Sequence, residues 1–174
     1  MAIDAAHMVA LVKTGAGQRS WNAKALKLAE RSGNRKARHW RASLLNNIGW
    51  SQFGSGAYGA ALRSFRRALL YRQNQRNPAE TRIARWCVAR TLRSMGRTRE
   101  ALRMQRRLLG DWRRAKRTDG YVFEELGECL LKLGRSREAG RYFGKAYAEL
   151  SKDRWLVRND ADRLKRLLRL SGAR

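Results

Sequence analysis

Apolar residues recur along the chain every three to four positions, the spacing at which side chains share one face of an α-helix. One such stripe contains Ala61, Leu62 and Phe65, and basic residues such as Arg63 and Arg66 stand between its members. The sequence shows no sustained alternation of apolar and polar residues, which would indicate a strand. The pattern therefore predicts a chain of helices joined by short turns.

Local signals mark where these helices begin and end. Asn77 is suited to cap a helix, Pro78 suits the first helical position, and Glu80 stands three residues after the cap. Asp119 opens a later helix, and Asn159 or Asp160 opens the last one. Glycines mark the expected helix ends, at Gly54, Gly56, Gly96, Gly134 and Gly172. These signals predict a succession of helix, turn and helix throughout the chain.

A similar segment occurs three times along the sequence. Its second helix carries an alanine at positions 61, 101 and 139, so that successive copies are 40 and 38 residues apart. The first copy has Gly49 in its first helix and Phe65 in its second, and the third copy has Gly127 and Phe143 at the matching positions. Self-similarity of this kind is typical of helical repeat proteins.

The motif resembles the tetratricopeptide repeat (TPR), in which small residues let two helices pack closely and an aromatic residue fills the gap toward the next repeat. The resemblance covers residues 42–151, with a period longer than the usual repeat of about 34 residues. The middle copy departs most, with Ala89 for the glycine, Gln105 for the aromatic residue and Leu108 for the second alanine. The resemblance implies an all-α, right-handed α-solenoid of antiparallel helix pairs with a C-terminal capping helix.

We predict a single TPR-like helical repeat domain over residues 1–174. Its expected parts are a degenerate N-terminal helix pair over 1–35, repeats over 36–76, 77–117 and 118–151, and a capping helix over 153–171. Within the N-terminal pair, the helices are expected at residues 5–13 and 20–31. Atypical ends of this kind are common in repeat arrays.

Charge changes this picture more than any other property of the composition. The chain has 40 Lys and Arg against 14 Asp and Glu, a formal net charge of +26. Such a surplus favours an acidic partner, such as a nucleic acid, an anionic membrane surface or an acidic protein. No apolar run reaches the roughly 18 residues of a membrane span, and the first residues lack the features of a secretory signal. We therefore expect a soluble, cytoplasmic protein.

Residues suited to catalysis or metal binding are scarce. Cys87 and Cys129 are far apart and each of the two histidines is isolated, whereas a metal site needs three or four ligands at defined spacing. We predict no metal and no cofactor, and we expect both thiols in the core. Glu124 and Glu128 share a helix face and could in principle form a carboxylate pair, but we favour a solvated face or pairing with nearby arginines. We expect no enzymatic activity.

By resemblance to TPR proteins, the first helices of the repeats line a concave groove that binds an extended peptide. The groove positions carried onto this chain are Asn46, Trp50, Trp86, Arg90 and Arg93. The two tryptophans would offer flat apolar surfaces, unless they belong to the core between repeats. The two arginines would fork onto a carboxylate or a phosphate.

A second candidate surface lies on the outward face of the second helices. Alignment of the repeats on their alanines places basic residues at the same positions in each copy. We name this set the arginine ridge, and it comprises Arg63, Arg66, Arg67, Arg103, Arg106, Arg107, Arg141 and Lys145. Arginine is a good helix former and outward positions are ordinarily polar. Outward positions usually mix both signs, however, and here they rarely do.

Two functions follow from these surfaces. The favoured one is a non-catalytic TPR-type scaffold whose arginine ridge binds polyanions, with RNA or a ribonucleoprotein first among them, without reading base sequence. The alternative is a protein-interaction adaptor that binds an acidic or C-terminal peptide in the groove, with a positive charge that is solubilising or engineered. Association with an anionic membrane surface is a third option.

Overall fold

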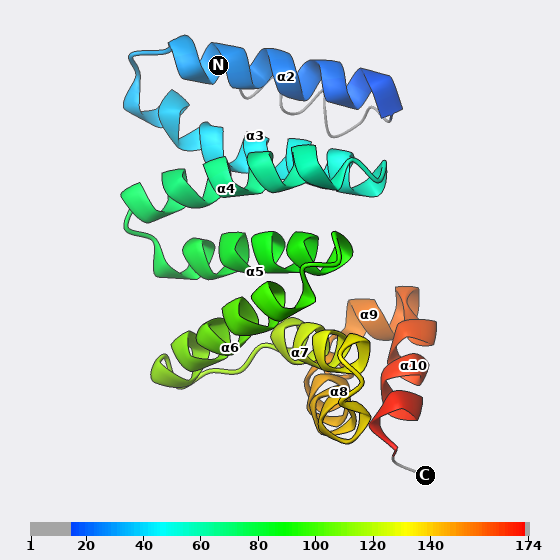
Figure 1. Ribbon diagram of the computed structural model, residues 1–174. Coiled ribbons are helices and arrows are strands. Elements are labelled where there is room, and N and C mark those ends of the chain that lie inside the picture. The colour runs from blue at the N-terminus through cyan, green and yellow to red at the C-terminus, as the bar shows by residue number, and fades with distance from the viewer. Residues whose placement is uncertain (1–14, 173–174) are drawn as a thin grey trace. The chain divides into compact units, whose positions relative to one another are not determined.

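The computed structural model describes residues 15–172, and this part of the chain consists of α-helices and turns without a strand. The helices, labelled as in Figure 1, are α2 (Gly15–Arg31), α3 (Arg35–Gly54), α4 (Tyr58–Asn74), α5 (Pro78–Ser94), α6 (Thr98–Arg114), α7 (Gly120–Lys132), α8 (Ser136–Leu150), α9 (Arg154–Asn159) and α10 (Ala161–Ser171). The predicted all-α class is confirmed.

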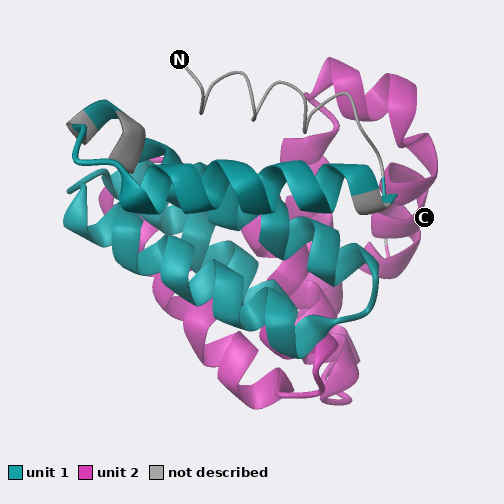
Figure 2. Ribbon diagram, turned by 90° about the horizontal axis from the view of Figure 1, so that it is seen from above, with its two compact units in different colours: residues 1–91 teal, residues 92–174 magenta. Residues whose placement is uncertain are grey.

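The chain divides into two compact units, Met1–Thr91 and Leu92–Arg174 (Figure 2). The first unit contains α2, α3, α4 and most of α5, and the second contains the end of α5 and α6 to α10. The helix expected at residues 20–31 is part of α2, whereas the one expected at 5–13 lies outside the described residues. The repeat boundaries stay predictions.

In the first unit, α2 packs against α3, and α3 packs against α4. Their apolar faces meet in a core, which consists of Ala25, Leu26, Ala29, Leu44, Leu45 and Ala68. In the second unit, α7 packs between α6 and α8, and α10 packs against α8 and α9. The helical stripes read from the sequence are therefore the faces that form these contacts.

The glycine and aromatic pairs of the repeat motif are points of close helix approach. A Cβ atom added at Gly49 on α3 would lie 2.5 Å from Cε1 of Phe65 on α4, and one at Gly127 on α7 would lie 2.7 Å from Cε1 of Phe143 on α8. Carbon atoms in favourable contact are about 3.5–4.0 Å apart. Both phenyl rings are completely buried and cannot move out into solvent. A residue larger than glycine at either position would therefore clash with the ring.

The middle repeat departs from this pattern at both positions together. Ala89 and Gln105 occupy the matching sites, and both side chains are completely buried. In the other two repeats, a Cβ atom on the first helix is incompatible with an aromatic ring on the second. The middle repeat therefore lacks both members of the glycine and aromatic pair.

The predicted helix boundaries are confirmed at the starts of α5 and α7. The Asn77 side chain accepts a hydrogen bond from the Glu80 backbone N–H at 3.2 Å, and Pro78 is the first residue of α5. The Asp119 carboxylate accepts one from the Tyr121 N–H at 2.9 Å. The turns after α3, α5 and α7 contain glycines with φ of +77°, +79° and +74°, a left-handed conformation that strains other residues.

The C-terminal segment consists of two helices rather than the single capping helix expected over 153–171. Asp160, between α9 and α10, has φ −144° and ψ 44°, which is not helical. The buried side chain of Leu156 holds α9, and those of Leu164 and Leu167 hold α10. The break allows each helix to direct its own apolar face inward.

Candidate functional site

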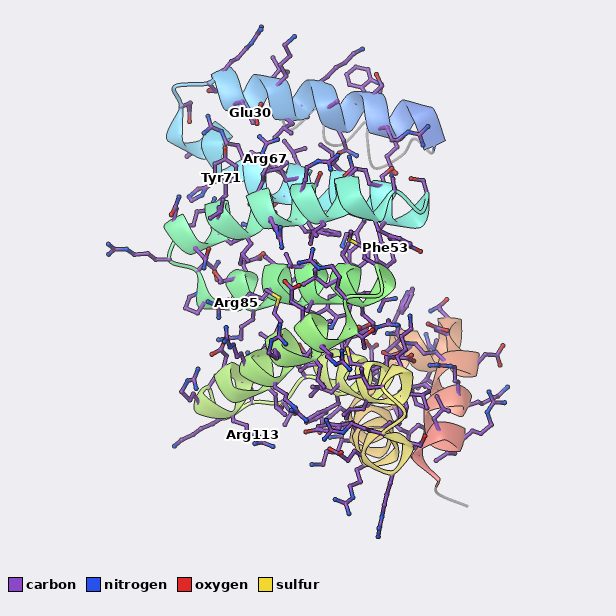
Figure 3. The ribbon with its side chains drawn as sticks, in the orientation of Figure 1. Glu30, Phe53, Arg67, Tyr71, Arg85 and Arg113 are labelled. Carbon is purple, nitrogen blue, oxygen red and sulfur yellow. The ribbon has the colours of Figure 1, made fainter. Side chains whose placement is uncertain are left out.

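The arginine ridge of the sequence analysis is exposed at every position. Its members lie on α4 in the first unit and on α6 and α8 in the second, and all eight side chains are open to solvent. Arg67 forms an ion pair with Glu30 of α2 (Figure 3). Among residues 15–172, this is the one ion pair that the ridge forms. The ridge therefore keeps nearly all of its positive charge.

The carboxylates of the described residues are used elsewhere. Several pair with an arginine one turn away at a helix end, as Glu100 does with Arg97 at 2.9 Å and Glu138 with Arg135 at 2.6 Å. Between residues 15 and 172, each carboxylate either forms an ion pair or caps a helix. The acidic side chains in this range therefore leave the middle of the second helices almost without a balancing negative charge.

The acidic cluster of α7 is neutralised by arginines, as one interpretation of the sequence expected. Arg93 donates two parallel hydrogen bonds to Glu125, of 2.7 and 2.8 Å. Burial alone would lower the pKa of Arg93, but the hydrogen bonds and charge of Glu125 raise it above its usual value.

Two arginines of α10 complete this cluster. Arg163 donates from Nε to Glu124 at 3.0 Å, and Arg166 pairs with Glu128. Glu124 and Glu128, the candidate carboxylate pair, are therefore each bound to a guanidinium group. This arrangement suits structural ion pairing rather than proton transfer between two carboxyl groups.

Three of the predicted groove residues meet in the first unit. The rings of Trp50 and Trp86 have centroids 5.9 Å apart, and Trp50 also contacts Phe65 at 5.2 Å. The guanidinium carbon of Arg90 lies 5.3 Å from the Trp86 ring centroid and 5.7 Å from that of Phe53. The tryptophans and Arg90 are half-buried, so they form a joint aromatic and cationic surface.

The other two predicted groove residues have partners of their own. The Oδ1 atom of Asn46 accepts a weak hydrogen bond from the Cys87 thiol, with a distance of 3.6 Å. Arg93 belongs to the second unit, and its guanidinium group is held by Glu125. The guanidinium group of Arg93, which was predicted to bind a carboxylate or phosphate of a ligand, thus binds a carboxylate of the same chain.

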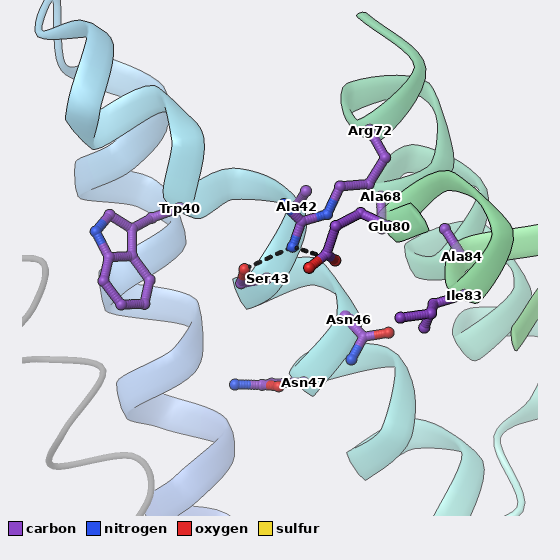
Figure 4. A pocket seen from close by; sticks show the side chains of 10 residues that line it. All are labelled: Trp40, Ala42, Ser43, Asn46, Asn47, Ala68, Arg72, Glu80, Ile83 and Ala84. Carbon is purple, nitrogen blue, oxygen red and sulfur yellow. Dashed lines mark hydrogen bonds and ion pairs between the residues drawn. The ribbon is translucent and has the colours of Figure 1, made fainter. Parts of the chain in front are cut away.

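A pocket of about 350 Å³ lies between α3, α4 and α5 of the first unit (Figure 4). Within it, the Nη2 atom of Arg72 donates to the Ser43 hydroxyl at 2.8 Å and lies 3.2 Å from Glu80 Oε2. Asn46 of this pocket was among the predicted groove residues, whereas the residues that α4 and α5 contribute were not predicted. Their sequence positions carry no common signal, because the fold alone brings Arg72 and Glu80 toward Ser43.

The two cysteines are free, buried thiols, as expected. Burial raises the pKa of Cys87 and of Cys129 to about 12, so neither is a ready nucleophile near neutral pH. Within residues 15–172, no cluster of His, Cys, Asp and Glu suits a metal ion. None of the helices in the same range combines the length and the apolar character that crossing a bilayer requires.

Comparison with protein-family models and with curated proteins finds no match. Among solved structures, the chain is similar to the nearly identical TPR-like repeats of a protein assigned as a kinesin light chain from Podosopora anserina. One crystal structure of these repeats, of a form with a single substitution, has a TM-score of 0.62 and 14% sequence identity, covering 99% of this chain and 87% of that one. A second crystal structure has a TM-score of 0.61 and 14% identity, covering 99% and 88%.

These similarities establish the fold. The protein is a TPR-like α-solenoid repeat protein, as the resemblance in its sequence implied.

Proposed function

We propose that the chain is a non-catalytic TPR-type scaffold that binds RNA through its arginine ridge. One observation carries the proposal: all eight ridge side chains are exposed, and only Arg67 among them pairs with a carboxylate of residues 15–172. Charges of one sign repel one another over a Debye length of about 8 Å at physiological salt. The phosphates of a bound RNA would relieve this repulsion.

Phosphate contacts supply affinity without reading base sequence. Each arginine that neutralises a phosphate releases counterions, and log K falls with log salt by about 0.7 for each contact on a single strand. The guanidinium group also matches the phosphate geometry with two parallel hydrogen bonds. We therefore expect RNA binding with a steep salt dependence and little sequence preference.

The experiment measures fluorescence anisotropy of a labelled, unstructured RNA across a salt series. The ridge variant carries Arg103→Gln, Arg106→Gln and Arg107→Gln on α6. We expect weaker binding at low salt and a salt slope reduced by about 2, the share of three phosphate contacts.

A matched control removes the same charge from helix ends. It carries Arg97→Gln, Arg114→Gln and Arg135→Gln, whose arginines pair with carboxylates one turn away. The control should keep most of the salt slope. A wild-type protein that binds no RNA at low salt, or a control as impaired as the ridge variant, would contradict the proposal.

A second candidate function is an adaptor for an acidic or C-terminal peptide in the groove. The observation in its favour is the half-buried surface of Trp50, Trp86 and Arg90. Charge reversal separates the two functions, with glutamate at ridge positions 63, 67, 103 and 107. The reversed protein should lose RNA binding if the ridge is the site, whereas an adaptor would bind its peptide with almost unchanged affinity.

A further inference from the structure

One tryptophan stands apart from the others in its exposure. Trp155 on α9 has an exposed fraction of 65%, whereas the other five tryptophans are buried or half-buried. Tryptophan is highly buried on average, because its large apolar ring gains most from leaving water. A ring this exposed is accessible to a binding partner.

The backbone of Trp155 is fixed on both sides. The Asp153 carboxylate accepts a hydrogen bond from the Trp155 N–H at 2.8 Å, and the Asn159 side-chain amide donates to the Trp155 carbonyl at 2.9 Å. The next residue, Leu156, is 1% exposed and anchors α9 in the core of its unit. The ring is therefore presented from a rigid turn of helix.

Two arginines flank this ring. Arg154 and Arg158 are exposed and lie four residues apart, so they share a face of α9 beside Trp155. Within residues 15–172, neither arginine forms an ion pair, since the neighbouring Asp153 carboxylate caps the helix. An aromatic plane beside two unpaired guanidinium groups suits a ligand that is flat and carries negative charge.

We propose that Trp155 is a stacking platform for an unpaired RNA base, with Arg154 and Arg158 binding the adjoining phosphates. This inference rests on the proposed function and deepens it, because it specifies single-stranded RNA. Bases within a duplex are covered by their neighbours, whereas an unpaired base exposes a face on which an indole stacks. Stacking is tolerant of sequence, since every base has such a face.

The test compares Trp155→Ala with the wild type on three probes: an unstructured 12-nucleotide RNA, a duplex RNA of equal length and heparin, a polyanion without bases. We expect binding to the single strand to weaken by about five- to 150-fold, with unchanged binding to the duplex and heparin. The salt slope should stay the same, because no phosphate contact is removed. Trp155→Phe should retain most of the affinity.

Val157→Ala is the matched control, because Val157 is also apolar, exposed and on α9. It should behave as the wild type on all three probes, and thermal melting by circular dichroism verifies that each variant folds. Equal affinity of Trp155→Ala and wild type for the single strand would overturn the stacking platform while leaving the ridge intact. Equal losses on all three probes would overturn it as well.

Two other outcomes would assign Trp155 to a different partner. Self-association of the wild type that Trp155→Ala abolishes, without an effect on RNA, would show that a second copy covers the ring. Binding to phosphatidylserine vesicles that depends on Trp155, again without an effect on RNA, would assign it to a membrane surface. Failure of the wild type to bind any RNA would overturn the proposed function and this inference together.

Discussion

Replacement of Gly127 by alanine tests the close packing of α7 against α8. The added Cβ atom would lie 2.7, 2.8 and 3.0 Å from Cε1, Cδ1 and Cζ of Phe143, a ring with no exposed surface. Overpacking a core of this kind costs about 1–3 kcal/mol. Alanine also gains about 1 kcal/mol over glycine inside a helix, so the net loss of stability should be about 1 kcal/mol and at most about 2.

The same substitution at Gly110 provides the matched control. Gly110 lies inside α6, and an added Cβ atom would meet only the flexible end of Arg114, at 3.6 Å. Gly110→Ala should therefore stabilise the protein by about 0.5–1 kcal/mol. The difference between the two variants isolates the contact with Phe143, because both gain the same helix propensity.

Urea denaturation followed by circular dichroism at 222 nm measures both variants, with the midpoint and the m-value fitted together. A Phe143→Leu background removes part of the ring, so Gly127→Ala should cost less there than in the wild type. Equal stability of Gly127→Ala and Gly110→Ala would refute the reasoning that glycine is needed to admit the ring.

Two further substitutions test buried polar groups of the second unit. Gln105 is completely buried, and its amide atoms have no hydrogen-bond partner among residues 15–172; Gln105→Leu should stabilise the protein by about 1–2 kcal/mol, and a lower urea midpoint would contradict this. Glu125→Ala removes both hydrogen bonds of the largely buried Arg93 guanidinium group and, among residues 15–172, leaves it only the longer contact with Glu128, at 3.8 Å. This loss should cost about 2–3 kcal/mol, whereas Glu138→Ala in an exposed pair should change stability by less than about 1 kcal/mol. If the two glutamate variants changed the free energy of unfolding equally, burial would not decide how much an ion pair contributes to stability.

The helices and the repeat were predictable because their signals are local. The apolar stripe of α4, the Asn77 cap of α5 and the glycines of the turns each act within a few residues of themselves. The TPR-like pattern followed from self-comparison, because each repeat meets the same packing problem. Asp160 was predictable as the start of the last helix. The formation of α9 as a separate helix was not predictable, because this depends on the burial of Leu156 in the core.

The candidate sites were predictable only in part. The outward positions of the second helices followed from the register of the alanines, and the structure leaves these side chains exposed. The pairing of Arg93 with Glu125 was not foreseen, because it joins residues 32 positions apart. The position of Arg90 was not foreseen either, because its guanidinium group lies over rings from two helices, α3 and α5.

By itself, the sequence determined the amount of charge, the helical class and the repeat, because composition and periodicity are properties of the chain. Pairs one turn apart, such as Arg97 with Glu100, are local in the sequence, whereas tertiary structure alone decided which arginines balance the carboxylates of α7. Ion pairs form over a few ångströms, and long flexible side chains reach whichever partner the packing brings near. The α7 carboxylates are thus bound by Arg93, Arg163 and Arg166, while the arginine ridge keeps its charge and Trp155 keeps its exposure.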